Sequence, residues 1–217
     1  MTHTWDERAE AYRTSAVHAA GLDLDLVIEL CESHPGLKAL DVATGGGHVA
    51  RRLREAGVEV VTVDPALAMH PDVVASAESL PFPDGSFDVV VNRLAAHHFA
   101  SIPAAVGEFG RVTRGLVVIE DHRYTDEQTE AAEQLRDPSH GRSLSEDEWR
   151  EQLGWAGLDV DRVEHFDMEL DFESWFARTQ TPADSQNQVR ELLAPRTAPD
   201  GLTWTSPILI LRARKPA

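Results

Sequence analysis

The stretch LDVATGGGHVA, residues 40–50, places three consecutive glycines between an apolar run and a helical pattern. The apolar run LKALDVA, residues 37–43, has the length of a buried strand, and the apolar residues after the glycines recur at helical spacing until Gly57. Where a strand leads through glycine residues into a helix, unpaired backbone N–H groups and the positive end of the helix dipole lie at one place. We therefore expect an anionic group to lie against the main chain at these glycines.

A carboxylate follows at the end of the next expected strand. VEVVTVD, residues 58–64, ends in Asp64, which lies 19 residues after Gly45. A carboxylate in this position can accept two hydrogen bonds from a ribose diol. The two features together predict a nucleotide-like ligand without saying which one, because GGGHVA also satisfies the loose dinucleotide fingerprint G-x-G-x-x-A.

Alternating strands and helices predict an α/β fold. Three further β-branched runs are separated by polar or helical segments, at residues 72–77, 87–92 and 115–121. Such an alternation predicts a mostly parallel sheet that is covered on both faces.

The remainder of the chain has a different pattern. Two capping boxes, Thr125 with Gln128 and Ser145 with Glu148, predict helix starts, and a third helix is expected from Thr181 as its cap. A strand from about residue 158 into DRVEHFDMELDF and a last strand at residues 207–214 complete the pattern. No repeat or linker divides the chain, so we expect a single domain over residues 1–217, with a substrate-side helical insertion around 124–156.

The charge restricts the partners. A formal net charge of −17 repels phosphate backbones and anionic lipids, so we expect neither a nucleic-acid partner nor a stable membrane association. No signal-peptide pattern and no membrane-spanning run occur, which predicts a cytoplasmic protein. Cys31 is the single cysteine and cannot form an intramolecular disulfide. The oligomeric state is left open.

The segment AESLPFPDGSFDVVVNRLAAHHF, residues 77–99, carries a more specific resemblance. Together with LDVATGGGHVA and VDP, it resembles the class I S-adenosylmethionine-dependent methyltransferases, in particular the group similar to ubiquinone and menaquinone biosynthesis C-methyltransferases. The resemblance covers roughly the whole chain. It implies a Rossmann-like sheet of seven strands with the last strand antiparallel, S-adenosylmethionine as the methyl donor and a small-molecule acceptor.

The resemblance also implies roles for residues that match the family's motifs. Gly45 and Gly47 would let the methionine part of the cofactor approach the backbone, and Asp41 would orient the loop or reach the cofactor ammonium. Asp64 would hold the ribose hydroxyls. The remaining cofactor-binding positions are Pro65 and Met69 flanking the adenine, Ala77 offering its N–H to an adenine nitrogen, Asn92 facing the place where donor and acceptor meet, and Tyr12 closing the pocket.

The chain departs from the family pattern in three places. Only ALAMHP stands between VDP and DVVASA, where a full helix is usual, so the second helix should be missing or a single turn. Ser76 replaces a common acidic residue before Ala77, which weakens one adenine contact. RVTRGLVVIE lacks the usual proline-glycine-glycine turn before the fifth strand. The adenine side is therefore expected to be more open.

Methyl transfer from a sulfonium mainly requires alignment in a dry pocket, and a base is needed only if the acceptor arrives protonated. His97 and His98 after the fourth strand are the first candidates, and His140 is the next. His122 and Arg142 are further possibilities. No metal is expected, because His97 and His98 diverge on a helix and lack the i, i+4 spacing of a helical zinc site.

Four aromatic residues are candidates for lining an apolar acceptor pocket: Trp149, Trp155, Trp175 and Phe176. The leading interpretation is a small-molecule methyltransferase. Two alternatives remain open at this point: a methyltransferase-fold module that binds or regulates without catalysis, and a nicotinamide-dependent oxidoreductase.

Overall fold

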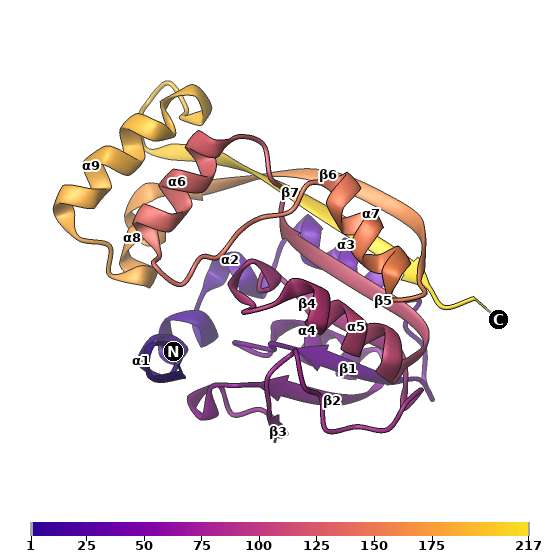
Figure 1. Ribbon diagram of the computed structural model, residues 1–217. Helices are drawn as coiled ribbons and strands as arrows, with labels where there is room; N and C mark the ends of the chain where they lie inside the picture. The colour runs from indigo at the N-terminus through magenta and orange to yellow at the C-terminus, as the bar shows by residue number, and fades with distance from the viewer. Residues whose placement is uncertain (1, 217) are drawn as a thin grey trace.

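The computed structural model describes residues 2–216, and within them one sheet of seven strands has the order β3-β2-β1-β4-β5-β7-β6 (Figure 1). The strands are β1 Lys38–Val42, β2 Glu59–Asp64, β3 Val73–Val74, β4 Phe87–Arg93, β5 Thr113–His122, β6 Asp159–Asp171 and β7 Thr203–Arg214. Strands β1 to β5 pair in parallel, and β7 runs antiparallel to both β5 and β6. The Rossmann-like sheet and its antiparallel last strand are confirmed.

Helices cover both faces of the sheet. The helices are α1 Thr2–Arg13, α2 Ala16–Ala19, α3 Leu22–Leu30, α4 His48–Glu55, α5 Ile102–Val112, α6 Glu127–Arg136, α7 Glu146–Trp155, α8 Phe172–Thr179 and α9 Ala183–Leu192, with short 3-10 turns η1 Leu67–Met69, η2 Ala96–His98 and η3 Ala194–Arg196. Apolar residues of α3 and α4 pack on one face of the sheet, and those of α5 and α7 pack on the other. Parallel strands covered in this way are buried on both sides, which explains the β-branched runs.

The β6–β7 hairpin extends beyond the parallel strands. Among the strands of the sheet, β6 is the partner of residues 203–207 of β7, because β5 ends opposite Ile208, and Trp204 also forms an isolated bridge with Thr197. The helices α6, α8 and α9 gather around this extension (Figure 1), where Leu170 and Trp204 join a separate apolar cluster with Trp175 and Phe172. This group of helices stands beside the carboxyl ends of the central strands, so it can form one wall of a site there.

The expected helical insertion is divided between two places. Helix α7 packs against α5 and covers the sheet, whereas α6 packs against α9 on the hairpin extension. The capping box of Ser145 and Glu148 is confirmed at the start of α7. The cap predicted at Thr125 is wrong, because Asp126 caps α6 by accepting from the Thr129 N–H at 2.7 Å.

Two other local predictions differ from the structure. The run at residues 72–77 forms a strand only at Val73–Val74, where it borders β2 at the edge of the sheet. Thr181 does not cap α9, whose N-cap position is Pro182; instead, the Thr181 hydroxyl donates to the carbonyl of Arg136 at 3.1 Å. The expected loss of the second helix is confirmed, because only the turn η1 follows β2. No helix among residues 2–216 is long and apolar enough to cross a bilayer.

Candidate active site

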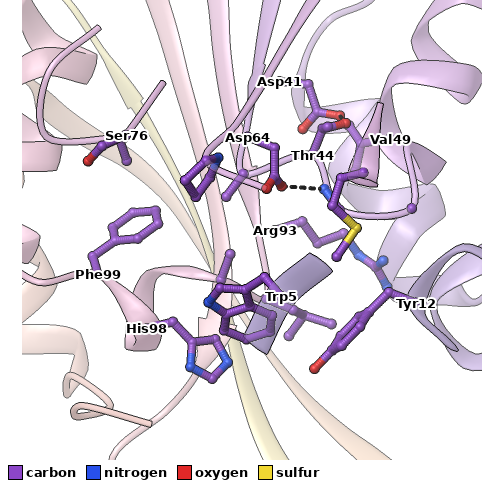
Figure 2. A pocket seen from close by; sticks show the side chains of 18 of the residues that line it. Trp5, Tyr12, Asp41, Thr44, Val49, Asp64, Ser76, Arg93, His98 and Phe99 are labelled. Atoms are coloured by element: carbon purple, nitrogen blue, oxygen red, sulfur yellow. Dashed lines mark hydrogen bonds between the residues drawn. The ribbon is translucent and has the colours of Figure 1, made fainter. Parts of the chain in front are cut away.

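A cavity of about 280 Å³ lies at the carboxyl ends of β1, β2 and β4 (Figure 2). This is the position where the chain turns from β1 outward to β2 and later crosses back to β4, and open α/β sheets bind ligands at such a switch point. Of the predicted site residues, the cavity brings together Tyr12, Asp41, Gly45, Asp64, Pro65, Met69, Ala77 and His98. We call this space the main cavity.

The glycine loop forms the floor of the main cavity between β1 and α4. Gly45 and Gly47 have φ values of 52° and 73°, a left-handed conformation that glycine adopts without strain. A Cβ on Gly46 would lie 2.7 Å from the carbonyl oxygen of Tyr12 and 2.6 Å from Nε2 of His48. Gly46 therefore allows α1 to approach the loop closely, a role that the sequence analysis did not assign.

Asp64 connects the end of β2 to the glycine loop. Its Oδ2 accepts from the Gly45 N–H at 3.0 Å, and its Oδ1 accepts from the Ala66 N–H at 2.9 Å (Figure 2). Burial raises the pKa of this carboxyl above its ordinary value, and the two backbone N–H groups oppose that rise. A carboxylate has about four acceptor sites, so each oxygen retains capacity for a ligand hydroxyl.

Asp41 is held within the loop itself. Its Oδ2 accepts from the Thr44 hydroxyl at 2.7 Å and from the Ala50 N–H at 3.2 Å, which ties the loop to the first turn of α4. Burial raises the pKa of Asp41 to about 6, against the lowering effect of these two hydrogen bonds. Asp41 also borders the main cavity. Its contacts match the loop-orienting alternative given in the sequence analysis.

Helix α1 forms one wall of the main cavity through Trp5 and Tyr12, whose rings meet edge to face at 5.9 Å (Figure 2). On one side, Asp6 accepts from the Ala68 N–H at 2.9 Å, which joins α1 to the turn η1. On the other side, Arg8 makes a bidentate ion pair with Asp137 at 3.0 Å, just after α6. The helix thus bridges the two ends of the site.

Two predicted cofactor residues lie outside the main cavity. Asn92 is fully buried, and its Nδ2 donates to the carbonyl of Val42 at 2.9 Å, so the amide joins β4 to β1 behind the cavity wall. The expected position of Asn92 at the meeting point of donor and acceptor therefore differs from the structure, because the strand's pleat turns this side chain inward. Gly47 stands one residue beyond the lining, as the N-cap of α4.

His97 and Asp121 form a buried dyad beside the main cavity. His97 Nδ1 lies 2.5 Å from Oδ1 of Asp121, and the His97 backbone N–H donates to Oδ2 at 2.8 Å. Burial lowers the pKa of His97 well below its ordinary value, and the nearby His122 and His140 lower it further. Burial raises the pKa of Asp121 to about 6. At neutral pH the arrangement is therefore a neutral imidazole that donates Nδ1–H to a carboxylate, which leaves Nε2 as a proton acceptor.

His98 borders the main cavity beside Trp5, with ring centroids 4.7 Å apart (Figure 2). Its Nδ1 lies 3.1 Å from the carbonyl oxygen of Ser139. Burial and the neighbouring His97 hold the pKa of His98 well below its ordinary value. The two rings do not diverge as expected, because a 3-10 turn places their centroids 4.0 Å apart.

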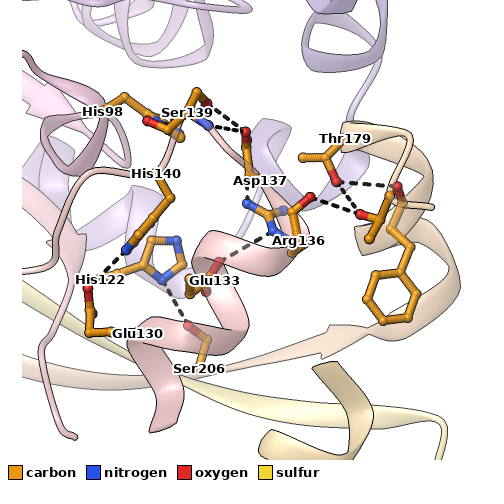
Figure 3. Close-up of polar contacts among 12 residues, drawn as sticks. His98, His122, Glu130, Glu133, Arg136, Asp137, Ser139, His140, Thr179 and Ser206 are labelled. Carbon is orange, nitrogen blue, oxygen red and sulfur yellow. Dashed lines mark hydrogen bonds and ion pairs between the residues drawn. The ribbon is translucent and has the colours of Figure 1, made fainter. Parts of the chain in front are cut away.

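His140 lies one layer behind these groups (Figure 3). Its Nε2 is 3.0 Å from Oε2 of Glu130, and its ring lies 5.2 Å from that of His97. Burial opposes protonation, but the hydrogen bond to Glu130 raises the pKa of His140 above its ordinary value. Arg142 is exposed and pairs with Glu148 at 2.6 Å. Neither residue lines a cavity, so both lie away from any reacting atoms.

Several residues of the site were missed by the sequence analysis: Trp5, Gly46, Arg93 and Asp121. Trp5, Ala9 and Tyr12 recur at i, i+4 and i+7, so a helical pattern was available for Trp5. Asp121 lies one residue before the end of the fifth strand and Asp64 lies at the end of the second, which was a similar signal. Of the four aromatic candidates, Trp149 and Phe176 are core residues and Trp155 is exposed, so only Trp175 borders a cavity.

A model of the family described as Methyltransferase domain matches residues 11–163. The uncharacterized methyltransferase YcgJ of Bacillus subtilis is 34% identical over 207 residues, which cover 85% of this chain and 82% of the relative. Its crystal structure superposes with a TM-score of 0.81 at 27% identity, covering 89% of this chain and 98% of that one.

Two further relatives each match less than half of the chain. The demethylmenaquinone methyltransferase of Renibacterium salmoninarum is 33% identical over 99 residues, covering 41% of this chain and 42% of the relative. The malonyl-[acyl-carrier protein] O-methyltransferase of Serratia marcescens is 32% identical over 109 residues, covering 44% of this chain and 43% of the relative.

The fold, the glycine loop and these matches define a class I methyltransferase. The chain belongs to the methyltransferase domain family, and neither a nicotinamide-dependent oxidoreductase nor a non-catalytic module accounts for it as well.

Proposed function

We propose that this protein transfers a methyl group from S-adenosylmethionine to a small-molecule acceptor. The observation that carries the proposal is the main cavity, in which the glycine loop, the Asp64 carboxylate and the side chains of Pro65 and Met69 share one space of about 280 Å³. Ligand pockets commonly begin at about this size, near 300 Å³. Both relatives are named as methyltransferases, which is consistent with methyl transfer, and the acceptors in their names belong to those proteins.

The residues fit the cofactor in three respects. Gly45 and Gly46 leave the floor of the cavity without side chains, so a ligand can approach the main chain. Asp64 has unused acceptor sites on both oxygens for a ribose diol. Pro65, Met69 and Ala77 provide an apolar slot at the end of β2 for an adenine ring.

When bound, S-adenosylmethionine supplies a methyl group that is electrophilic because it is carried on a positively charged sulfur. The protein then has to hold the acceptor in line with that methyl group, and good alignment can contribute about 7 to 11 kcal/mol. Trp5, Tyr12 and His98 form a wall of this space that a bound acceptor can pack against. His97, oriented by Asp121, accepts a proton at Nε2 if the acceptor arrives protonated.

Isothermal titration with S-adenosylmethionine, S-adenosylhomocysteine and NAD, after removal of copurified ligand, tests the proposal. We expect one-to-one binding of the two adenosyl ligands and no heat with NAD. Preferential binding of NAD, or silence from all three at millimolar ligand, would contradict it. A screen of acceptors that detects release of S-adenosylhomocysteine would then identify the reaction.

A further inference from the structure

A second, smaller cavity of about 30 Å³ adjoins the main cavity, and we call it the inner cavity. Tyr12, His18, Leu94 and His98 border both spaces, so the two cavities share a wall. The inner cavity is otherwise enclosed by the end of β5, by β6 and by helices α6 and α8. The residues that line the inner cavity come from other elements than the turn η1, so a ligand group in it lies away from the proposed adenine slot at Met69.

Two arginines face the inner cavity, Arg136 from α6 and Arg178 from α8. Arg136 is buried, with its side chain 5% exposed, and its guanidinium lies over the Trp175 ring at 4.4 Å. Arg136 has an ion-pair partner in Glu133 at 3.3 Å (Figure 3), although its Nε makes no hydrogen bond within the described residues.

The carboxylates around the inner cavity are already paired. Asp137 takes the bidentate contact from Arg8 at 3.0 Å, and Glu133 takes Arg136. Glu130 is held by His140 at 3.0 Å, and Asp121 by His97. Each of these acidic groups thus already has a contact to a basic side chain, although His97 is neutral and Asp137 has a second partner in Arg136 at 3.9 Å.

Arg178 differs from Arg136 because it has no direct anionic partner among the residues that the structure describes. Within the described part of the chain, its guanidinium makes no ion pair and no side-chain hydrogen bond, although the residue is half-buried. Asp171, seven residues earlier, is engaged in capping α8 by accepting from the Ser174 N–H at 2.8 Å. Burial and the neighbouring Arg136 lower the pKa of Arg178, and the weaker opposite effects of Glu133 and Asp171 do not compensate for them.

We propose that the methyl acceptor carries a carboxylate, which Arg178 binds in the inner cavity with Arg136 beside it. This inference rests on the proposed methyl transfer and names the chemical class of its acceptor. Arginine presents two parallel N–H groups that match the two oxygens of a carboxylate. The small volume favours a planar carboxylate over a bulkier phosphate. The rest of the acceptor passes the shared wall of Tyr12, His18 and His98 and extends toward the main cavity.

The anchoring also explains why the net charge of −17 does not exclude an anionic acceptor. The long-range field disfavours anions in general, but a short-range, partly desolvated guanidinium outweighs it at contact distance, because electrostatic interactions strengthen in a low dielectric. We expect the preference for an anionic acceptor over a neutral one to come from the contact with Arg178. Loss of Arg178 should therefore remove the preference for an anion without disturbing the cofactor residues.

The test is a titration of protein saturated with S-adenosylhomocysteine, using benzoate, its uncharged analogue benzamide, and phenyl phosphate as probes. We expect benzoate to bind at least tenfold more tightly than benzamide and more tightly than phenyl phosphate. Arg178→Gln should abolish the preference for benzoate and leave the affinity for S-adenosylhomocysteine within twofold of wild type. Arg178→Lys should retain part of it.

The matched control is Arg150→Gln on α7, which removes an exposed arginine that pairs with Glu146 at 2.8 Å. It should keep the full preference for benzoate. Equal binding of benzoate and benzamide, no binding of benzoate, or an unchanged preference in Arg178→Gln would overturn the proposal. Tighter binding of phenyl phosphate would overturn the assignment of a carboxylate. If S-adenosylhomocysteine itself fails to bind, the proposed function fails, and benzoate titrated alone still decides the role of Arg178.

Discussion

Replacing Asp64 with asparagine is expected to weaken the fold and the cofactor site by different amounts. Asp64 accepts one backbone N–H at each oxygen, from Gly45 and from Ala66. Asparagine has only one acceptor oxygen, so its NH₂ group has to face one of these two N–H groups. A buried N–H left without a partner costs about 1 to 3 kcal/mol. For a chain of 217 residues, each kcal/mol corresponds to a fall in Tm of about 2 to 4 °C.

Asp64→Asn is also expected to weaken cofactor binding, in addition to its effect on the stability of the fold. Hydrogen bonds to a carboxylate contribute about 1.5 to 3 kcal/mol each, against about 0.5 to 1.5 kcal/mol for neutral pairs. A ribose diol would form two such bonds, and a loss of 1.4 kcal/mol is a tenfold change in affinity. We therefore expect Asp64→Asn to bind S-adenosylhomocysteine at least tenfold more weakly, as measured by isothermal titration below its Tm.

Asp72→Asn is the matched control. Asp72 accepts from the Thr62 N–H at 2.9 Å and from Arg54 at 3.0 Å next to β3, outside the main cavity. It should lower Tm while the affinity for S-adenosylhomocysteine stays within twofold of wild type. If Asp64→Asn also stays within twofold, the ribose contact assigned to Asp64 is wrong, whatever happens to its Tm.

Three further results are expected. Gly46→Ala places a Cβ 2.7 Å from the Tyr12 carbonyl, so α1 should shift from the loop and hydrogen exchange in residues 2–13 should rise; unchanged exchange would contradict the close approach. Arg8→Met leaves the buried Asp137 without its arginine partner, and breaking a buried pair costs about 3 to 5 kcal/mol; the cost is reduced here because Ser139 still donates to that carboxylate. A decrease in the free energy of unfolding of less than about 0.5 kcal/mol, measured by urea denaturation, would refute this estimate. Burial raises the pKa of Asp41 to about 6, above its value in the unfolded chain, so the protonated carboxyl favours the folded state. This contribution to the free energy of unfolding is fully present below about pH 4 and falls by about 3 kcal/mol as the pH rises to 6. Asp41→Asn should flatten the stability profile between pH 4 and pH 6, and parallel profiles in both proteins would argue against it.

The sheet could be predicted because its strands are buried on both faces and therefore have continuous β-branched runs. The β1, β2, β4 and β5 segments were found within two residues of their observed bounds. Helix α8 was not predicted, since its start, Asp171–Phe172, continues the β6 pattern without a break. Both helix starts were predicted one residue too early. At α6 the adjacent Thr125 and Asp126 are both good caps, and at α9 the Thr181 hydroxyl binds the Arg136 carbonyl, which leaves Pro182 at the N-cap without a side-chain hydrogen bond.

The site was predictable where the backbone conformation demands a particular residue. Gly45 and Asp64 follow from a turn and a strand end, and both border the main cavity. Asn92 could not be placed, because a strand residue faces the cavity or the core according to the pleat, and the β4 run is apolar on both sides. Arg136 and Arg178 meet only through the packing of α6 and α8 onto the β6–β7 hairpin, which no local pattern encodes.

Helix α1 has only 12 residues, too few for a helix to be stable by itself in water, so its docking depends on Arg8, Asp6 and the contact at Gly46. Trp5 and Tyr12 on this helix form one wall of the main cavity. Ligand binding and helix docking are linked. If docking of α1 raises the affinity for a ligand by a certain factor, binding of that ligand raises the equilibrium constant for docking by the same factor. The affinity measured for any ligand of the cavity therefore includes the docking equilibrium of residues 2–13. A tag joined to the N-terminus would alter the dissociation constant without touching the ligand.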